Sequence, residues 1–213
     1  MKKSFCCYTA FGDSLTFGTG SDTQEGFAAR VFQQLQRRDN GAGSVQSHIH
    51  GVVGATASEL LCVLRSNEEL RRQVSAAALL TISAGGNDLI RAAVQKYING
   101  ASVTMRPAMR RFSDVYDELV KEVVTLQGNR GSTIVLLNSY NPFPVFKDAV
   151  LWVQFVNRCV MRTAERYGQA VKVARVYEHF SGREDALLSD DGVHPNDEGH
   201  QVLAECVLET IEA

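Results

Sequence analysis

Apolar residues form two patterns that alternate along the chain. Short continuous apolar runs predict buried strands at about 5–11, 45–53, 78–83, 133–137 and 171–177. Stretches with an apolar residue at every third or fourth position predict helices. These lie at about 26–38, around 60–64, at 68–76, from just after residue 88 to about 97, and at 107–127, 147–167 and 196–211. We expect loops at 138–144, which contain two prolines, and at 178–193. Because strands alternate with helices, the pattern predicts five parallel strands with helices on both faces.

The length and composition are those of an ordinary globular domain. The 213 residues suffice for one α/β domain, which we expect to span 1–213, and 45% of them are apolar and 22% charged. A net charge of −2 lacks the basic excess that binds nucleic acids or anionic membranes, and no stretch is long enough to span a bilayer. We therefore expect no nucleic-acid partner and no stable membrane association.

The cysteines bear on the cellular compartment. There are five, widely spaced and without a Cys-x-x-Cys motif, which indicates free thiols in a reducing environment. The apolar run after Lys2 and Lys3 ends at the turn of residues 12–14, before a signal-peptide cleavage site could fit. The sequence therefore predicts a cytoplasmic protein.

Residues with candidate chemistry occur where the predicted strands end. Ser14, Gly54, Asn87 and Asp191 each follow a different strand. In doubly wound parallel sheets the ligand site lies beyond the carboxyl ends of the strands. We therefore expect one edge of the sheet to bring these residues together.

Ser14 stands on a sharp turn, Gly12-Asp13-Ser14, at the end of the first strand. Glycine allows the tight turn, and a rigid strand could hold the serine facing a cleft, as a nucleophile requires. On this turn alone, the simpler interpretation is that the serine caps the following helix. A nucleophile needs a base, an orienting acid and an oxyanion site from elsewhere in the chain.

His194 is the candidate base. Asp191 precedes it by three residues, and Gly192 between them allows a turn that would bring the carboxylate to the imidazole. We expect Pro195 to occupy the first position of the last helix and to hold His194 at its entrance. The alternative is a helix-entry loop with a surface histidine.

Gly54 and Asn87 are candidate hydrogen-bond donors to an oxyanion. A glycine N–H can approach a substrate closely, and an asparagine amide donates without changing its charge. The alternative for residues 85–88 is a plain strand-to-helix turn that Asn87 or Asp88 caps.

A metal site is a weaker hypothesis. His194, Asp197 and His200 match no strong ligand spacing, and we expect His200 to be exposed to solvent. His48 and His50 alternate on one strand face, but no nearby residue clearly completes a ligand set.

Four blocks of sequence, taken together and in order, resemble the SGNH (GDSL) hydrolases. They are Gly12-Asp13-Ser14-Leu15, Gly54, Gly86-Asn87-Asp88 and Asp191-Gly192-Val193-His194-Pro195. The chain is similar to bacterial GDSL-type lipase/acylhydrolases, which also carry a stretch like Tyr140-Asn141-Pro142-Phe143. One position departs from the family pattern, because Ile49 stands where the second block usually has an asparagine. The serine is not in a Gly-x-Ser-x-Gly elbow, so the α/β-hydrolase signature is absent.

The resemblance implies a three-layer flavodoxin-like fold with strand order 2-1-3-4-5. It also implies an ester hydrolase that needs no metal or other cofactor. By matching position, Ser14 is the implied nucleophile, His194 the base and Asp191 its partner. The implied oxyanion hole consists of the Ser14 N–H, the Gly54 N–H and the Asn87 side chain. The expected substrate is a small-molecule carboxylic ester with a short- to medium-chain acyl group.

The substrate is less well specified because the family is broad. Carbohydrate O-deacetylase, thioesterase, lysophospholipase and acyltransferase activities stay open. A non-catalytic binding module is a further alternative, but it predicts a degraded triad or a blocked oxyanion site, and neither is present in the sequence.

Apolar residues near the strand ends are candidates to contact the acyl group. They are Leu15 and Phe17 beside the serine, and Phe143 in a loop that two prolines stiffen. Alternatively, Phe143 covers the edge of the core. No long insertion could serve as a lid, so we expect no activation at a lipid–water interface.

Overall fold

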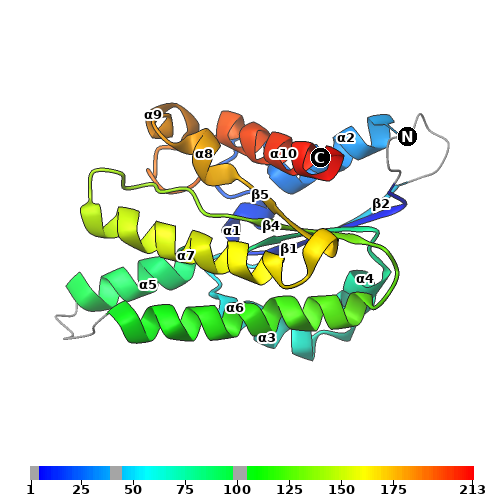
Figure 1. Ribbon diagram of the computed structural model, residues 1–213. Coiled ribbons are helices and arrows are strands. Elements are labelled where there is room, and N and C mark those ends of the chain that lie inside the picture. The colour runs from blue at the N-terminus through cyan, green and yellow to red at the C-terminus, as the bar shows by residue number, and fades with distance from the viewer. Residues whose placement is uncertain (1–4, 39–44, 98–104) are drawn as a thin grey trace.

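Five parallel strands form one sheet at the centre of the molecule (Figure 1). The computed structural model describes residues 5–38, 45–97 and 105–213. The strand order is β2-β1-β3-β4-β5, as the resemblance implied. The strands are β1 (Cys7–Gly12), β2 (Gln46–Gly51), β3 (Leu79–Ser83), β4 (Thr133–Leu137) and β5 (Val171–Ala174).

Helices connect the strands and cover both faces of the sheet. They are α1 (Ser14–Phe17), α2 (Phe27–Arg38), α3 (Ala57–Ser66), α4 (Glu68–Ala76), α5 (Gly86–Tyr97), α6 (Met105–Gln127), α7 (Lys147–Glu165), α8 (Val176–Phe180), α9 (Glu184–Leu187) and α10 (Asp197–Glu212), with a 3₁₀ turn at Gly168–Ala170. The predicted doubly wound α/β architecture is thus confirmed. Within the described part of the chain, the structure contains no helix long and apolar enough to cross a membrane.

Two apolar clusters, one on each face of the sheet, form the core. Helices α3, α4, α6 and α7 supply one cluster, and α2, α8 and α10 supply the other, on the opposite side of the sheet in Figure 1. The central strands β1, β3 and β4 are buried along their whole length, since helices cover both of their faces. This burial makes the carboxyl ends of the central strands a rigid support for the residues that follow them.

The last predicted strand and the predicted loop after it differ from the structure. Strand β5 ends at Ala174, and two short helices, α8 and α9, occupy much of the segment expected to be irregular. Val176 and Phe180, four residues apart on α8, are both buried against the core. Their spacing is that of one helical turn, and a single turn is too short to produce a recognisable periodicity.

The position predicted for Pro195 was also wrong. Helix α10 begins at Asp197, and its cap is Asn196, whose side chain accepts a 2.9 Å hydrogen bond from the Gly199 N–H. Pro195 therefore precedes the cap and lies outside the helix. Its segment instead forms an isolated antiparallel bridge with Leu188, which closes the base of the loop that carries His194.

Candidate active site

The turn after β1 places Ser14 at the carboxyl edge of the sheet. Gly12 pairs with Gly51 of β2 on one side and with Ser83 of β3 on the other. A Cβ at Gly12 would lie 2.3 Å from the Ser83 Oγ, so the strands can approach this closely only with a glycine there. The close approach lets Ser83 reach the first residues of the turn.

Asp13, and not Ser14, caps the short helix α1. The Asp13 carboxylate accepts hydrogen bonds from the Leu15 N–H at 3.1 Å and from the Ser83 hydroxyl at 2.8 Å. Burial raises the pKa of Asp13 above its usual range, although these two hydrogen bonds act in the opposite direction. Because Asp13 satisfies the helix, the interpretation of Ser14 as a cap was wrong, and the Ser14 hydroxyl is available for another partner.

That partner is His194. The Ser14 Oγ lies 3.0 Å from the His194 Nε2, and the His194 Nδ1 lies 2.6 Å from the Asp191 Oδ2. The three side chains, which belong to opposite ends of the chain, thus form one hydrogen-bonded line. The other Asp191 oxygen accepts the N–H groups of Val193 and His194, each at 2.8 Å, and the Ser189 hydroxyl at 3.0 Å.

These contacts determine the charge of Asp191 and the tautomer of His194. Partial burial tends to raise the pKa of Asp191, but hydrogen bonds from His194, Val193 and Ser189 hold it well below its usual range. An ionised carboxylate accepts the Nδ1–H of the imidazole, which leaves Nε2 as the acceptor for the Ser14 hydroxyl.

A tyrosine that the sequence analysis did not single out as a site residue supports the histidine loop. Tyr140, in the segment after β4, donates a 2.6 Å hydrogen bond to the Val193 carbonyl, and its ring stacks on Phe180 at 4.5 Å. Burial raises the pKa of Tyr140 well above its usual range, so the hydroxyl stays protonated as a donor. The sequence signals for this residue were its position just beyond a strand and its place in the family-like stretch of residues 140–143.

The loop after β2 is held by the first two turns of α5. Asn87 donates to the Ala55 carbonyl at 3.1 Å, Asp88 accepts the Ala57 N–H at 2.9 Å, and Arg91 donates to the Gly54 carbonyl at 2.9 Å. Burial raises the pKa of Asp88 to about 6 despite the Ala57 N–H. Neither Asn87 nor Asp88 is the cap of α5, since both lie inside its first turn.

Gly54, the predicted backbone donor, adopts a left-handed conformation and is not among the residues that line the cavity beside Ser14. Its φ of +77° lies in the left-handed region, where other residues are strained. Among the described residues, none accepts a hydrogen bond from the Gly54 N–H. The Gly54 carbonyl is held by Arg91, so the orientation of this peptide segment is fixed from α5.

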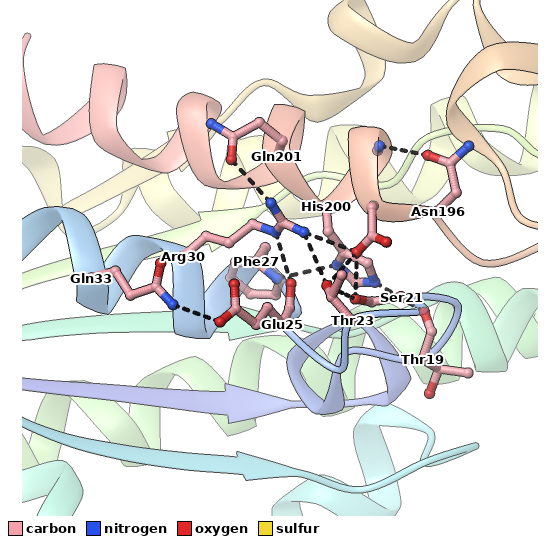
Figure 2. Close-up of polar contacts among 12 residues, drawn as sticks. Thr19, Ser21, Thr23, Glu25, Phe27, Arg30, Gln33, Asn196, His200 and Gln201 are labelled. Atoms are coloured by element: carbon pink, nitrogen blue, oxygen red, sulfur yellow. Dashed lines mark hydrogen bonds and ion pairs between the residues drawn. The ribbon is translucent and has the colours of Figure 1, made fainter.

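A second polar network joins the segment after Ser14 to the start of α10 (Figure 2). Asp197 accepts hydrogen bonds from Ser21 and Thr23, both at 2.7 Å, and forms an ion pair with Arg30 at 2.9 Å. Figure 2 shows these contacts bridging the 19–25 segment, α2 and α10, close in sequence to both Ser14 and His194.

The prediction that His200 is exposed was wrong. Its side chain is fully buried, where Nδ1 accepts the Phe27 N–H at 3.2 Å and Nε2 donates to the Thr19 carbonyl at 3.0 Å. Burial lowers the pKa of His200, which favours the neutral ring. A signal was available, since His200 precedes Leu203 by three residues and so shares the inward face of α10.

Two of the residues considered as metal ligands, Asp197 and His50, are engaged by other side chains in the described part of the chain. Asp197 is bound to Arg30 and two hydroxyls, and His50 lies against Gln73. Across residues 5–38, 45–97 and 105–213, no group of three or more histidine, cysteine or acidic side chains could hold an ion.

A cavity of about 990 Å³ opens beside Ser14 and His194. Leu15 and Phe143, two of the residues predicted to contact the acyl group, line it, and so does Asn87. Most of the other lining side chains are apolar, among them Ile90, Ala93, Val94, Tyr97, Val145, Phe146, Trp152 and Val153.

Phe17, the third residue predicted to contact the acyl group, does not line this cavity. A Cβ at Gly51 would lie 2.2 Å from the Phe17 nitrogen, so Phe17 packs against the end of β2. The cavity lies on the other side of β1, where Ser83 of β3 and Leu137 of β4 contribute to its wall. The Phe17 side chain is 62% exposed to solvent.

Fold and site together describe a doubly wound α/β protein with a serine, a histidine and a carboxylate at the carboxyl edge of its sheet. Comparison with known proteins agrees with this description. The spore germination lipase LipC of Bacillus licheniformis is 31% identical over 202 residues, which cover 93% of this chain and 92% of that protein.

Solved structures give the same result. The lipase Lip_vut3 from a goat rumen metagenome superposes with a TM-score of 0.84 at 29% identity, over 96% of each chain. A mutant of the acetylxylan esterase Axe2 from Geobacillus stearothermophilus has a TM-score of 0.75 at 19% identity, over 99% of this chain and 96% of that one, and shares the fold. The model of the GDSL-like Lipase/Acylhydrolase family matches residues 10–202, so the chain belongs to that family of ester hydrolases, as its four sequence blocks indicated.

Proposed function

We propose that this protein is a serine hydrolase that cleaves short- to medium-chain carboxylic esters through an acyl-enzyme on Ser14. The observation that carries the proposal is the line from the Ser14 Oγ through the His194 ring to Asp191, with separations of 3.0 and 2.6 Å. This line ends at the wall of a cavity that is large enough for an ester and mostly apolar.

In the first step, the Ser14 Oγ attacks the ester carbonyl carbon while its proton passes to the His194 Nε2. The imidazolium that forms is stabilised by the Asp191 carboxylate, whose low pKa keeps it ionised. Since Asp191 is held by three further donors, it orients the ring before substrate binds.

The negative charge that develops on the carbonyl oxygen requires donors that are already in position. We assign this role to the N–H groups of Ser14 and Gly54 and to the Asn87 side chain. The support is local: Asn87 lines the cavity beside Ser14, and Gly54 has an N–H that no described residue accepts, on a segment that α5 holds in place.

The intermediate then collapses as His194 returns its proton to the departing alkoxide, which leaves as an alcohol. The acyl group remains on Ser14 until a water molecule, deprotonated by His194, attacks it and releases the acid. An alcohol in place of water would give acyl transfer with the same residues. We favour hydrolysis because most of the side chains that line the cavity are apolar and do not form a recognisable site for a polar alcohol acceptor.

The composition of the cavity favours an apolar acyl group over an acetylated sugar. A sugar has several hydroxyl groups, each of which needs a hydrogen-bond partner when it leaves water. The wall away from Ser14 and His194 consists mainly of aliphatic and aromatic side chains. An acyl chain gains free energy from such a surface without requiring partners.

Replacing the nucleophile tests the proposal. We expect Ser14→Ala to keep the fold and to lower kcat on p-nitrophenyl butanoate by about three to six orders of magnitude, because the three residues act as a unit. A fluorophosphonate probe should label the wild-type protein on Ser14 alone, as peptide mass spectrometry would establish.

Ser66→Ala provides the control, since Ser66 is exposed and, among the described residues, its hydroxyl donates to carbonyls of its own helix. This variant should retain both activity and labelling. Substantial turnover by Ser14→Ala, or labelling of another serine, would show that the nucleophile is wrongly assigned.

A further inference from the structure

One face of α5 lines the cavity along the whole helix. Asn87, Ile90, Val94 and Tyr97 follow one another at intervals of three or four residues, and all of them line the cavity. At a rise of 1.5 Å per residue, Asn87 and Tyr97 are about 15 Å apart along the helix axis. The cavity is therefore an elongated groove with one end beside Ser14.

The first turns of α7 and the segment before it form the opposite wall of the groove. Ala149, Trp152 and Val153 of α7 line it, together with Phe143 and Phe146. In Figure 1, α5 and the start of α7 both extend beyond the carboxyl edge of the sheet, and contacts between their side chains show that they lie side by side. The groove thus runs outward from Ser14 between two helices.

A cluster of four side chains joins the two helices at the far end. The rings of Tyr97 and Trp152 lie 6.0 Å apart, and the Tyr97 hydroxyl donates to Asp148. The Lys96 Nζ lies 3.0 Å from Asp148 and 4.8 and 5.2 Å from the Tyr97 and Trp152 ring centres. We call Lys96, Tyr97, Asp148 and Trp152 the terminal cluster.

The Lys96, Tyr97 and Asp148 polar groups of the terminal cluster bind one another, and the rings of Tyr97 and Trp152 supply apolar surface to the groove beside Asp148. Asp148 accepts from both Lys96 and Tyr97, and the ammonium of Lys96 contacts the two rings. Such contacts hold the rings of Tyr97 and Trp152 in place, and both rings line this end of the groove. The cluster is suited to meet the apolar end of a chain.

We propose that the groove along α5 binds the acyl chain of the ester and that the terminal cluster limits the length of this chain. The inference rests on the proposed function, since it places the ester carbonyl at Ser14. An extended chain advances about 1.2 Å per bond, as three bonds per residue span about 3.3–3.6 Å in an extended backbone. A groove of about 15 Å therefore spans about twelve bonds and holds an acyl chain of about twelve to thirteen carbons.

The first experiment blocks the middle of the groove. Ala93 lines it between Asn87 and Tyr97, so Ala93→Phe should lower kcat/KM on decanoyl esters by about tenfold to 100-fold and affect acetyl esters much less. Gln95→Phe is the matched control, because Gln95 is exposed on the same helix and does not line the groove. This control should leave the chain-length profile unchanged.

The second experiment opens the far end. Tyr97 is 59% exposed, so Tyr97→Ala should fold, and it should raise kcat/KM on hexadecanoyl relative to decanoyl esters by about tenfold. Equal changes on every ester in both variants, or a wild-type preference for acetyl esters, would overturn the inference.

A binding measurement separates this inference from the proposed function. Decanoate should displace a fluorescent fatty-acid probe from the Ser14→Ala variant, and should displace it more weakly from the Ser14→Ala/Ala93→Phe variant. Acetate should displace the probe from neither variant. If the wild type hydrolyses no ester but decanoate binding depends on Ala93, the proposed function fails and the groove assignment stands. If esters are hydrolysed but Ala93→Phe does not change decanoate binding, the groove assignment fails and the proposed function stands.

Discussion

The turn that carries Ser14 and the loop that carries His194 hold their side chains by different means. Asp13 and Ser14 are only 3% and 5% exposed, and they are enclosed by the ends of β1 and β3. Asp191 is exposed, and its partners are mainly groups of its own loop, residues 189–194. The turn depends on close packing and the loop on hydrogen bonds.

The difference indicates what a substitution should affect in each region. Atoms in the turn cannot move without moving the central strands, so substitutions in the turn should lower the free energy of unfolding. The loop is tied to the core at few points, chiefly through Tyr140 and the bridge between Leu188 and Pro195. Loss of one hydrogen bond in the loop should disturb the orientation of His194 while most of the fold persists.

The largest expected effect lies in the loop. His194→Ala should lower kcat by about four orders of magnitude or more, because proton transfer from Ser14 is lost. Asp191→Asn should cost less but at least about tenfold, since the imidazole loses its charged partner and its preferred tautomer. Both variants should unfold at a urea concentration close to that of the wild type.

Asp190→Asn is the matched control for Asp191→Asn. Asp190 is the neighbouring exposed carboxylate, and none of the hydrogen bonds that orient His194 involves it. Esterase assays on the purified variants decide the assignment. A larger loss for Asp190→Asn than for Asp191→Asn would mean that the wrong carboxylate has been assigned.

The second effect concerns the turn and should appear mainly in stability. The Ser83 hydroxyl donates to the buried Asp13 carboxylate and lies 2.8 Å from the Thr16 hydroxyl. Ser83→Ala leaves a buried carboxylate with one donor fewer, which should lower the free energy of unfolding by about 2–3 kcal/mol. Urea denaturation measures this change, and Ser66→Ala, which loses a hydroxyl on an exposed helix face, should change it by less than about 0.5 kcal/mol.

The comparison would be wrong if Ser83→Ala had wild-type stability but greatly reduced activity. That outcome would assign to Ser83 a direct effect on Ser14 and not a role in packing the turn.

Local patterns predicted much of the fold. The bounds of β4 and α4 agree with the prediction, because glycines and strand-forming residues delimit the first and Asn67 caps the second. The end of β5 and the helices α8 and α9 were not predicted, since elements of four or five residues contain no full apolar period. Their conformation depends on burial against α10, which lies later in the chain.

The sequence indicated which strand ends carry the candidate residues, and the physical reason is related. Glycine turns after strands pointed to Ser14, Gly54 and Asn87, and the parallel sheet places the carboxyl ends of the preceding strands at one edge; Ser14 and Asn87 both line the cavity there. The hydrogen bonds of Tyr140 and His200 were not predictable in this way. Both side chains bind backbone groups distant in the sequence, and a backbone carbonyl or N–H carries no residue-specific signal.

The smallest expected effect is a pH dependence of stability that His200 causes. In the folded protein, burial lowers the pKa of His200, whereas in the unfolded chain the pKa is about 6.5. Below that pH the unfolded state binds more protons, so the contribution of His200 to stability is present above the unfolded pKa and is lost as the pH falls. The slope from one group cannot exceed about 1.4 kcal/mol per pH unit.

Asp88 acts in the opposite direction and must be separated from His200. Its folded pKa of about 6 lies above its unfolded value, so its contribution is largest in acid and is lost as the pH rises through about 6. His200→Gln removes only the histidine, since a glutamine amide can accept the Phe27 N–H and donate to the Thr19 carbonyl. Urea unfolding of wild type and variant should be compared between about pH 5 and pH 8. The free energy of unfolding of the variant should exceed that of the wild type by an amount that grows as the pH falls. Asp88 contributes equally to both proteins, so it cancels from this difference. If the free energy of unfolding varied with pH in the same way for both proteins, His200 would be protonated equally in the folded and unfolded chains. The charge of His200 would then have no effect on the stability of the network that joins α10 to the segment after Ser14.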